Sequence, residues 1–356
     1  MDTLLRTKKI QAFLPKKTAA IITGGSNLFY LTGFNSSAGT VFITKDKAYF
    51  LIDFRYFEKA KQTVKSCETV LLNNLSEQLN SLCKKHNISE IFIETENVSI
   101  SEFNSYKEIL PCEISKEDAL NKFILNIRSI KTTSELESIK AAQTLTEQTF
   151  DYILPRIETG RSEIEIMLEM EFFMRKLGSE GVAFDFIVVS GKNSSLPHGV
   201  PTKKKIEKGD FVTMDFGAVV NGYRSDMTRT VAVGSVTDKQ RQVYNTVLKA
   251  QLAALKEIKS GKLCCDIDKI SRDIIYSAGF EGCFGHSLGH SVGIDIHESP
   301  ALSPKCNTVL KTGTVMTVEP GIYIENEFGV RIEDMVYVTD KGCDNLTSSR
   351  KDLIIL

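Results

Sequence analysis

Four acidic residues occupy places in the C-terminal half of the sequence where a lone negative charge is unfavourable. Asp215 and Asp226 fall in one pair of alternating β-type segments at 210–233, and Glu319 and Glu333 fall in a second pair at 313–339. Two carboxylates within about 5 Å of each other on a strand pair repel. Glu319 also lies in the apolar run MTVEPGIYI, where an uncompensated charge is costly. A bound cation is the simplest way to offset both costs.

The first pair of segments surrounds Asn221-Gly222, a dipeptide that is typical of a two-residue β-hairpin turn. If the turn is centred at 220/221, Asp226 lies opposite Asp215. If Asn221 and Gly222 form the loop, Asp226 lies opposite Gly217. Because side chains alternate along a strand, both registers put the two acids on one face. One such acid fits a solvated sheet face, but a second hairpin with the same pattern favours a metal site.

The chain has only five histidines, and four of them fall between positions 198 and 297. Four carboxylates and one imidazole form an oxygen-rich ligand set, which suits Mn²⁺, Co²⁺, Fe²⁺ or Zn²⁺ better than a thiolate zinc site. Four carboxylates can hold two ions, and paired ions can deprotonate a bridging water at neutral pH. We therefore expect two divalent metal ions, with Mn²⁺ as the first candidate.

Three histidines and one arginine near these acids each allow two interpretations. His198, His286 and His297 fit hydrogen-bonded core histidines or groups of the site. Their glycine-flanked segments favour the site for His198 and His297, since a positioned imidazole can donate to a developing oxyanion. His286 stays open. Arg331 can pair with Glu333, which lies on the same strand face, or bind a substrate carboxylate through two hydrogen bonds.

Two repeated halves are expected to position the hairpins. In the first half, Ser134 and Glu137 predict a capping box for a helix that stops at Gly160, and Ser162 and Glu165 cap a second helix. In the other half, a capping box at 237–240 begins a helix that runs to 261, and another helix runs from near 266 to near 279. A His-bearing segment and a hairpin follow in each half at nearly equal spacing. We predict α+β halves related by a pseudo-twofold axis.

The N-terminal part of the chain has a different pattern, in which short β-type runs alternate with helical stretches. The runs are AAIIT, GTVFIT, AYFLID and EIFIET at 19–23, 39–44, 48–53 and 90–95. A chain of 356 residues also exceeds one ordinary small domain. We therefore predict an α/β domain over 1–125 and the repeated α+β domain over 126–356.

Composition argues against several classes of partner. Lys plus Arg is 44 and Asp plus Glu is 45, so the formal charge of −1 gives no basic field for nucleic acid or anionic lipid. No run of about 18 apolar residues occurs, as a membrane span would need. The eight cysteines form no C-x-x-C pair, which is consistent with reduced thiols. We expect a cytoplasmic protein without a nucleic-acid or membrane partner.

Five segments resemble the signature stretches of the pita-bread metallopeptidases. They are PHG at 197–199, MDFGAVVNGYRSDMTRT at 214–230, GHSLGHSVGIDIHESP at 285–300, VMTVEPGIY at 315–323 and GVRIEDM at 329–335. The long N-terminal domain and the P-H-G segment resemble the aminopeptidase P and prolidase branch, whose N-terminal domain is creatinase-like. SNLFYLTGF at 26–34, DFRYFEKA at 53–60 and IRSIKTTSELESIKAA at 127–142 extend the resemblance over essentially the whole chain.

This resemblance implies a set of metal ligands. Asp215, Asp226 and Glu333 would bind one ion, and Asp226, His290, Glu319 and Glu333 would bind the other. Asp226 and Glu333 would then bridge the two ions. His290 fits this set because one neutral imidazole completes a group of carboxylates.

The resemblance also implies roles in catalysis. A metal-bridging hydroxide would attack the carbonyl before proline, and Glu319 would help to move protons. His198 and His297 match residues that position substrate or stabilise the tetrahedral intermediate. His286 and Arg331 match residues that surround the metals or contact substrate.

The implied activity is that of an Xaa-Pro aminopeptidase or Xaa-Pro dipeptidase acting on peptides with proline in second position, as a homodimer. The alternatives are a methionine aminopeptidase-like enzyme, a creatinase-like amidinohydrolase and a non-catalytic pita-bread peptide binder. The long N-terminal domain argues against the first. The complete five-residue ligand set argues against the other two. Whether the substrates are dipeptides only or also longer peptides stays open.

Overall fold

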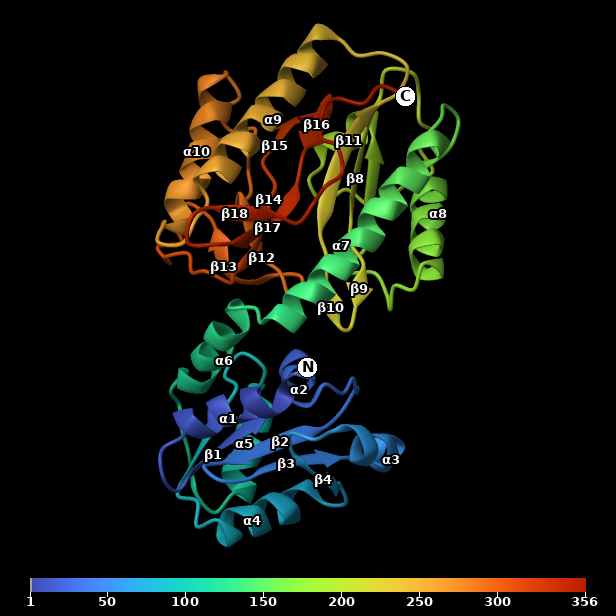
Figure 1. Ribbon diagram of the computed structural model, residues 1–356. Helices are drawn as coiled ribbons and strands as arrows, with labels where there is room; N and C mark the ends of the chain where they lie inside the picture. Colours follow the sequence, from blue (N-terminus) through green and yellow to red (C-terminus); the bar gives the residue numbers. More distant parts are fainter. Residues whose placement is uncertain (1) are drawn as a thin grey trace. The chain divides into compact units, whose positions relative to one another are not determined.

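The computed structural model describes residues 2–356, and the chain divides into two compact units, Met1–Arg128 and Ser129–Leu356 (Figure 1). The division falls at the C-terminal end of helix α6 (Ala119–Ser129), before its last residue. The border expected after residue 125 falls within the same helix. Each unit contains its own buried hydrophobic cluster.

The first unit is built on a six-stranded mixed sheet in the order β4-β3-β2-β1-β5-β6. Its strands are β1 (Thr18–Ile22), β2 (Thr40–Thr44), β3 (Ala48–Ile52), β4 (Glu68–Leu71), β5 (Glu90–Ile93) and β6 (Glu113–Ile114). Its helices before α6 are α1 (Thr3–Phe13), α2 (Gly25–Thr32), α3 (Phe54–Thr63), α4 (Leu75–Lys85) and α5 (Ile100–Ile109). Every residue of β1, β2 and β3 is buried, as in strands that are covered on both faces. The expected α/β class is confirmed.

The four expected strands of this unit all form, whereas β4 and β6 were not expected from the sequence. Both lie at the edges of the sheet, where one side lacks a neighbouring strand. β4 is only partly buried, and β6 has two residues. Short, half-exposed edge strands do not need the apolar run that marks a central strand, so the sequence carries a weaker signal for them.

The second unit contains two halves with the same succession of elements. The first half has helices α7 (Thr133–Ile153) and α8 (Glu163–Lys176), short 3₁₀ turns η1 (Leu154–Arg156) and η2 (Gly191–Ser195), and strands β7 (Ile187–Ser190), β8 (Phe211–Phe216), β9 (Val219–Val220), β10 (Tyr223–Arg224) and β11 (Met227–Ala232). The strand order of its main sheet is β11-β8-β7, and β9 pairs with β10 at the tip of the hairpin.

The second half has helices α9 (Asp238–Glu257) and α10 (Cys264–Ser277) and strands β12 (Gly289–Ser291), β13 (Glu298–Leu302), β14 (Val315–Val318), β15 (Gly321–Ile324), β16 (Phe328–Arg331), β17 (Asp334–Val338) and β18 (Cys343–Asn345). Its main sheet runs β13-β12-β14-β17-β18, and β15 pairs with β16. Figure 1 shows α7 and α8 on one side of the strands of this unit and α9 and α10 on the other. The repeated order of elements agrees with the predicted duplicated α+β fold.

The first hairpin adopts one of the two expected registers. Val220 pairs with Tyr223, and Asp215 pairs with Thr228, so Asn221 and Gly222 form the two-residue loop. Both loop residues have positive φ, 51° and 74°, as a type I′ turn requires. The alternative turn centred at 220/221 is therefore wrong.

The start of α7 corrects another prediction. The helix begins after Thr132 rather than after Ser134, and the capping carboxylate is Glu135 rather than Glu137. Glu135 accepts hydrogen bonds at 2.7 Å from the backbone N–H and the hydroxyl of Thr132, and at 2.7 Å from the Tyr223 hydroxyl. The sequence contains the capping pattern twice, two residues apart, and the tertiary bond to Tyr223 favours the earlier one. The capping boxes at Ser162 and at Thr237 form as predicted.

No helix among residues 2–356 is both long and apolar enough to cross a membrane.

Gly289 is expected to be indispensable for the packing of β12 against β14. A Cβ atom at this position would lie 2.0 Å from the Thr317 carbonyl oxygen, whereas a Cβ at Gly285 would meet nothing within 4 Å. We expect Gly289→Ala to cost about 3 kcal/mol of stability through overpacking, which lowers Tm by roughly 6–12 °C in a unit of this size. Gly285→Ala is the matched control and should change Tm by no more than about 2 °C. The Tm values are measured by thermal melts monitored by circular dichroism. Wild-type Tm values for both variants would contradict the prediction.

Candidate metal centre

The two hairpins place their acids at strand ends that face a common point. Asp215 lies near the end of β8, and Asp226 directly precedes β11. In the other half, Glu319 directly follows β14 and Glu333 directly precedes β17. All four carboxylates are largely shielded from water: the exposed fraction of Asp215, Asp226 and Glu333 is 8%, 4% and 1%. The duplicated fold therefore brings four acids into one shielded space.

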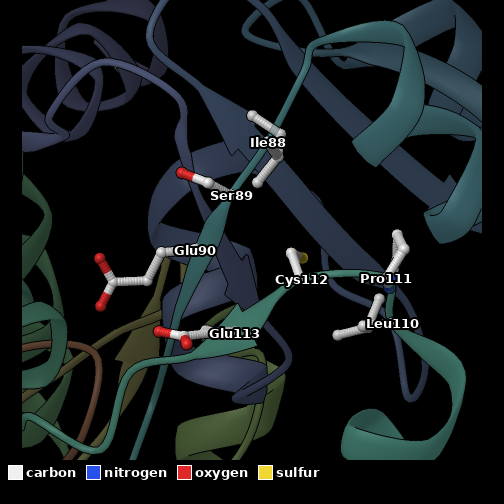
Figure 2. A pocket seen from close by; sticks show the side chains of 7 residues that line it. All are labelled: Ile88, Ser89, Glu90, Leu110, Pro111, Cys112 and Glu113. Atoms are coloured by element: carbon white, nitrogen blue, oxygen red, sulfur yellow. The ribbon is translucent and has the colours of Figure 1, made fainter.

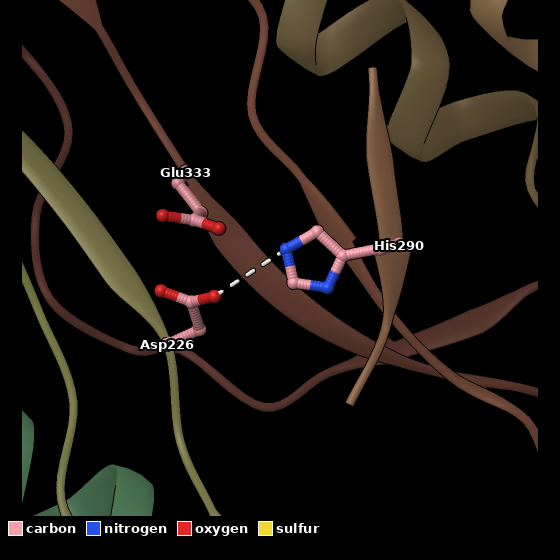
Figure 3. Close-up of side chains that lie close together, drawn as sticks. All are labelled: Asp226, His290 and Glu333. Atoms are coloured by element: carbon pink, nitrogen blue, oxygen red, sulfur yellow. Dashed lines mark ion pairs between the residues drawn. The ribbon is translucent and has the colours of Figure 1, made fainter. Parts of the chain in front are cut away.

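His290, on β12, joins this cluster. Ligand atoms of Asp226, His290 and Glu333 lie within 4.8 Å of one another, and Figure 3 shows the three side chains converging from separate segments. The His290 Nε2 atom lies 3.3 Å from Oε1 of Glu319 and 3.6 Å from Oδ2 of Asp226. The structure thus brings together all five residues that the sequence suggested as metal ligands.

Two oxygens of the cluster lack a partner. Oδ1 of Asp215 and Oε1 of Glu333 are buried and accept no hydrogen bond within residues 2–356. A buried acceptor without a partner costs about 1–3 kcal/mol, and more when it is charged. A divalent cation among these oxygens would remove that cost. The donor set of carboxylates and one imidazole fits such an ion.

The orientation of His290 supports the same interpretation. Its Nδ1 atom lies 3.2 Å from the Ser291 carbonyl oxygen, which can only accept, so Nδ1 carries the hydrogen. In the neutral ring, Nε2 then directs its lone pair at the acids, as metal-binding histidines do. The Thr317 hydroxyl connects the backbone N–H of His290, at 3.0 Å, to Oε1 of Glu319, at 3.1 Å. Sequence reasoning did not identify Thr317, although it lies two residues before Glu319.

Crowding in the shielded space raises the pKa values of two of the four acids. Burial, followed by the negative charges of Glu333, Asp215 and Glu319, raises the pKa of Asp226 well above its usual value. Burial and the charges of Glu319 and Asp215 likewise raise the pKa of Glu333. These are the directions expected for crowded carboxylates in a shielded space.

His290 and Glu319 form a pair in which each group favours the charge of the other. Burial alone would raise the pKa of Glu319, but the hydrogen bond and the attraction of His290 outweigh it and lower this pKa to about 2. Burial would lower the pKa of His290, but the hydrogen bond and the charge of Glu319 raise it. The two groups therefore stabilise each other's charged forms.

Arg331 supplies a fixed positive charge beside the acids. Its Nη2 atom lies 2.5 Å from Oδ2 of Asp215, so its ion-pair partner is Asp215 and not Glu333. The link to Glu333 is indirect: Nε of Arg331 donates to the Thr228 hydroxyl at 3.1 Å, and this hydroxyl donates to Glu333 at 2.7 Å. The partner was missed because Asp215 faces Arg331 across the two halves, and sequence spacing does not report such contacts.

His286 belongs to the same hydrogen-bond network. Nη1 of Arg331 donates to the Tyr323 hydroxyl at 2.7 Å, and this hydroxyl lies 2.9 Å from Nε2 of His286. Nδ1 of His286 donates to the Ser287 carbonyl oxygen at 2.8 Å, so Nε2 accepts from Tyr323. Burial lowers the pKa of His286 and keeps the ring neutral, as this arrangement requires. Tyr323 was missed from the sequence, although it lies in the segment VMTVEPGIY.

The two remaining histidines lie beside the cluster. The ring of His297 packs edge-on against His290, with centroids 4.4 Å apart. Burial, and then the charge of His290, lowers the pKa of His297. His198 is exposed on the segment after η2 and lies near enough to His286 and His297 to contribute to their lowered pKa values. The structure therefore gathers every histidine of the 198–297 region at one place.

A hollow in the first unit contains none of these residues. It lies beside β5 and β6 and is lined by Ile88, Ser89, Glu90, Leu110, Pro111, Cys112 and Glu113 (Figure 2). Glu90 and Glu113 are paired neighbours on the two strands. No group of three metal-binding side chains occurs here among the described residues.

The stability of the cation-free protein is expected to fall as pH rises. Asp226, Glu333 and His290 have higher pKa values in the folded than in the unfolded protein. Above about pH 4 the folded state therefore binds more protons than the unfolded state. The stability that these protons contribute is lost as pH rises through the pKa values of the folded state. A cation binds the deprotonated groups, and a hundredfold excess over Kd adds about 2.7 kcal/mol. Mn²⁺ should therefore raise the Tm of chelator-treated protein more at pH 8 than at pH 5. The control is NaCl at the same ionic strength. Equal Mn²⁺-induced shifts in Tm at pH 5 and pH 8, after subtraction of the NaCl effect, would contradict this account.

Comparison with known proteins places this geometry in a family. The model for Metallopeptidase family M24 matches residues 137–340, and the model for Creatinase/Prolidase N-terminal domain matches residues 6–130. An Xaa-Pro dipeptidase of Pyrococcus furiosus is 36% identical over 98% of this chain and 99% of its own length.

Solved structures agree over the full chain. An Xaa-Pro dipeptidase from Bacillus anthracis has a TM-score of 0.95 at 40% identity and covers 99% of this chain and 100% of its own. An X-Pro aminopeptidase from Thermotoga maritima has a TM-score of 0.91 at 34% identity and covers 99% of each chain. The expected fold and family are confirmed. The chain belongs to metallopeptidase family M24 and carries a creatinase/prolidase N-terminal domain.

Proposed function

We propose that this protein is a metal-dependent exopeptidase that hydrolyses the bond between an N-terminal residue and a following proline. One observation carries the proposal: four carboxylates and His290, from two repeated halves, converge on one shielded point in a member of a metallopeptidase family. The relatives named Xaa-Pro dipeptidase and X-Pro aminopeptidase support the choice of bond.

The proposed ligands are those that the sequence suggested. Asp215, Asp226 and Glu333 would hold one divalent cation, and Asp226, His290, Glu319 and Glu333 would hold a second. The unpartnered oxygens of Asp215 and Glu333 support this assignment. When bound, such ions lower the pKa of water and polarise a carbonyl, which supplies a nucleophile at neutral pH. Mn²⁺ is the first candidate, and Co²⁺, Zn²⁺ and Fe²⁺ are alternatives.

Protein side chains complete the chemistry. Glu319, whose carboxylate lies 3.3 Å from Nε2 of His290 and 3.1 Å from the Thr317 hydroxyl, is proposed to help move protons. His297 is neutral near pH 7 because burial lowers its pKa, and it can donate one hydrogen bond to the developing oxyanion. We assign to His198, which is exposed, the positioning of substrate or the stabilisation of the tetrahedral intermediate.

Arg331 and His286 are proposed to act through their neighbours. Nε, Nη1 and Nη2 of Arg331 bond to Thr228, to Tyr323 and Pro197, and to Asp215. Its guanidinium therefore holds Asp215 in place, and we do not assign it the binding of a substrate carboxylate. Both ring nitrogens of His286 are also engaged. Because protein groups already engage most of the donors of Arg331 and both nitrogens of His286, we propose that the enzyme accepts both Xaa-Pro and longer peptides.

Several finer features remain predictions. They are a homodimer, a cytoplasmic location, and the lack of a nucleic-acid or membrane partner. The formal charge of −1 supports the lack of a nucleic-acid or anionic-membrane partner, and the unpaired cysteines support a cytoplasmic location. The homodimer rests on the resemblance to the family alone. Size-exclusion chromatography with light scattering tests the oligomeric state.

Asp226→Asn tests the metal-dependent activity. The substitution keeps the side-chain volume but removes the charge that both cations share. We expect kcat/KM for an Xaa-Pro peptide to fall by about 100-fold or more, since ligand removal exceeds the 10- to 100-fold cost of changing an outer partner. Asp344→Asn, on the exposed strand β18, is the control and should keep wild-type activity. Undiminished activity of Asp226→Asn, measured by release of the N-terminal residue, would rule out the proposed ligand set.

A substrate panel separates the candidate functions. The wild type, loaded in turn with Mn²⁺, Co²⁺ and Zn²⁺, is given Xaa-Pro, Xaa-Pro-Yaa and Met-Ala-Yaa peptides. We expect release of the first residue from both proline peptides and none from Met-Ala-Yaa, because a proline site must fit a ring and an amide without N–H. Cleavage of Met-Ala-Yaa alone would favour a methionine aminopeptidase-like enzyme. Peptide binding without hydrolysis would favour the non-catalytic binder.

A further inference from the structure

Glu163, the first residue of α8, is a fully buried carboxylate outside the metal centre. It accepts hydrogen bonds from three residues. Ser190 donates its backbone N–H at 2.6 Å and its hydroxyl at 3.0 Å, and Thr202 donates the same two groups at 2.9 and 2.6 Å. The Asn193 amide donates to both carboxylate oxygens at 3.1 Å. Both oxygens of Glu163 are therefore fully used.

These partners bracket one loop. Ser190 ends β7, and Thr202 lies twelve positions later, so Glu163 joins the two ends of the segment 190–202, which we call the His198 loop. Between these ends the loop carries His198 and the Pro197 carbonyl, which accepts from Nη1 of Arg331 at 3.2 Å. The same arginine holds Asp215. The loop therefore contacts the metal centre at its middle and Glu163 at its ends.

Capping of α8 does not account for Glu163. The helix N-terminus is already capped by Ser162 and Glu165, which form a complete capping box. An acid in the first turn also gains from the helix dipole while exposed to water, so that gain does not require full burial. At the first position of α10, in the other half, the chain has Cys264, which is equally buried. Of α8 and α10, only α8, in the half that carries His198, therefore begins with a carboxylate.

We propose that Glu163 is a positioning residue, which fixes both ends of the His198 loop and thereby holds His198 in the geometry that substrate needs. This inference rests on the proposed function. Only a carboxylate offers acceptors to both ends at once, because a glutamine has one acceptor oxygen and an NH₂ that would face the N–H of Ser190 or Thr202. The Glu163→Gln protein therefore loses one end of the loop. A displacement of about 1 Å at a substrate-binding group can cost about 100-fold in rate.

The test compares Glu163→Gln with the wild type, both as full-length Mn²⁺-loaded protein. We expect kcat/KM for an Xaa-Pro peptide to fall by roughly 10- to 100-fold. The Mn²⁺ affinity measured by calorimetry should stay within about twofold, because no proposed ligand contacts Glu163. A loss of Mn²⁺ affinity in proportion to the loss of activity would show that Glu163 supports the metals instead, and would overturn the inference.

A double-mutant cycle with His198→Ala distinguishes positioning from general structural support. If Glu163 acts through His198, Glu163→Gln should change kcat/KM by less than about twofold once His198 is absent, because coupled residues are not additive. If the two losses multiply, the inference is wrong.

Two further variants keep the test informative if Glu163→Gln does not fold. Thr202→Val removes one hydroxyl donor at one end of the loop and leaves the Glu163 carboxylate in place. It should lower kcat/KM severalfold when His198 is present and should have no such effect in the His198→Ala protein. Glu147→Gln is the matched control: Glu147, on α7, accepts from Ser348 and Ser349 and fastens a different loop. It should lower Tm but leave kcat/KM within about twofold. Equal losses in Thr202→Val and Glu147→Gln would contradict the inference.

Failure of this inference and failure of the proposed function are distinguishable. A wild type that cleaves no Xaa-Pro peptide overturns the proposed function. An active wild type with an equally active, folded Glu163→Gln variant overturns only the role of Glu163.

Discussion

Mutual repulsion among four shielded carboxylates is the constraint on which the catalytic unit depends. Asp215, Asp226, Glu319 and Glu333 approach one another in a space with little water, where Coulomb interactions are strong. The protein supplies two positive partners, Arg331 beside Asp215 and His290 beside Glu319. Oxygens of Asp215 and Glu333 remain without a partner. The protein alone therefore does not neutralise the cluster, and a divalent cation completes it.

The surrounding structure holds these charges in place by hydrogen bonds that run between the halves. Arg229, fully shielded on β11, donates to the Glu333 backbone carbonyl and forms a 2.9 Å ion pair with Asp334 at the start of β17. On the site side, the hydroxyl of Thr228 on β11 donates to the Glu333 carboxylate and accepts from Arg331 on β16. The loop before β13 is fixed in a similar way, because Lys131 and Glu298 form a shielded ion pair at 2.8 Å next to His297. Groups that do chemistry therefore lie on a rigid frame.

Much of this arrangement could be predicted from the sequence because it follows from local rules. The alternation of side chains along a strand predicted that Asp215 and Asp226 lie on one face of the hairpin. The dipeptide Asn221-Gly222 predicted the register of its two strands. The family segments indicated the remaining site residues. Local rules failed where two choices were locally equal: the capping pattern occurs at both 132 and 134, and a bond from Tyr223, distant in sequence, decides between them. They also failed for the partner of Arg331 and for Glu163, whose contacts are long-range.

The central claim is that the five gathered residues hold two divalent cations that balance the carboxylates. The most direct measurement is calorimetric titration of chelator-treated protein with Mn²⁺, for the wild type and for Glu333→Gln, in which a shared ligand loses its charge. The account predicts two ions per chain in the wild type and the loss of at least one of them in the variant. Absence of Mn²⁺ binding by the wild type, or unchanged stoichiometry and affinity in Glu333→Gln, would contradict it.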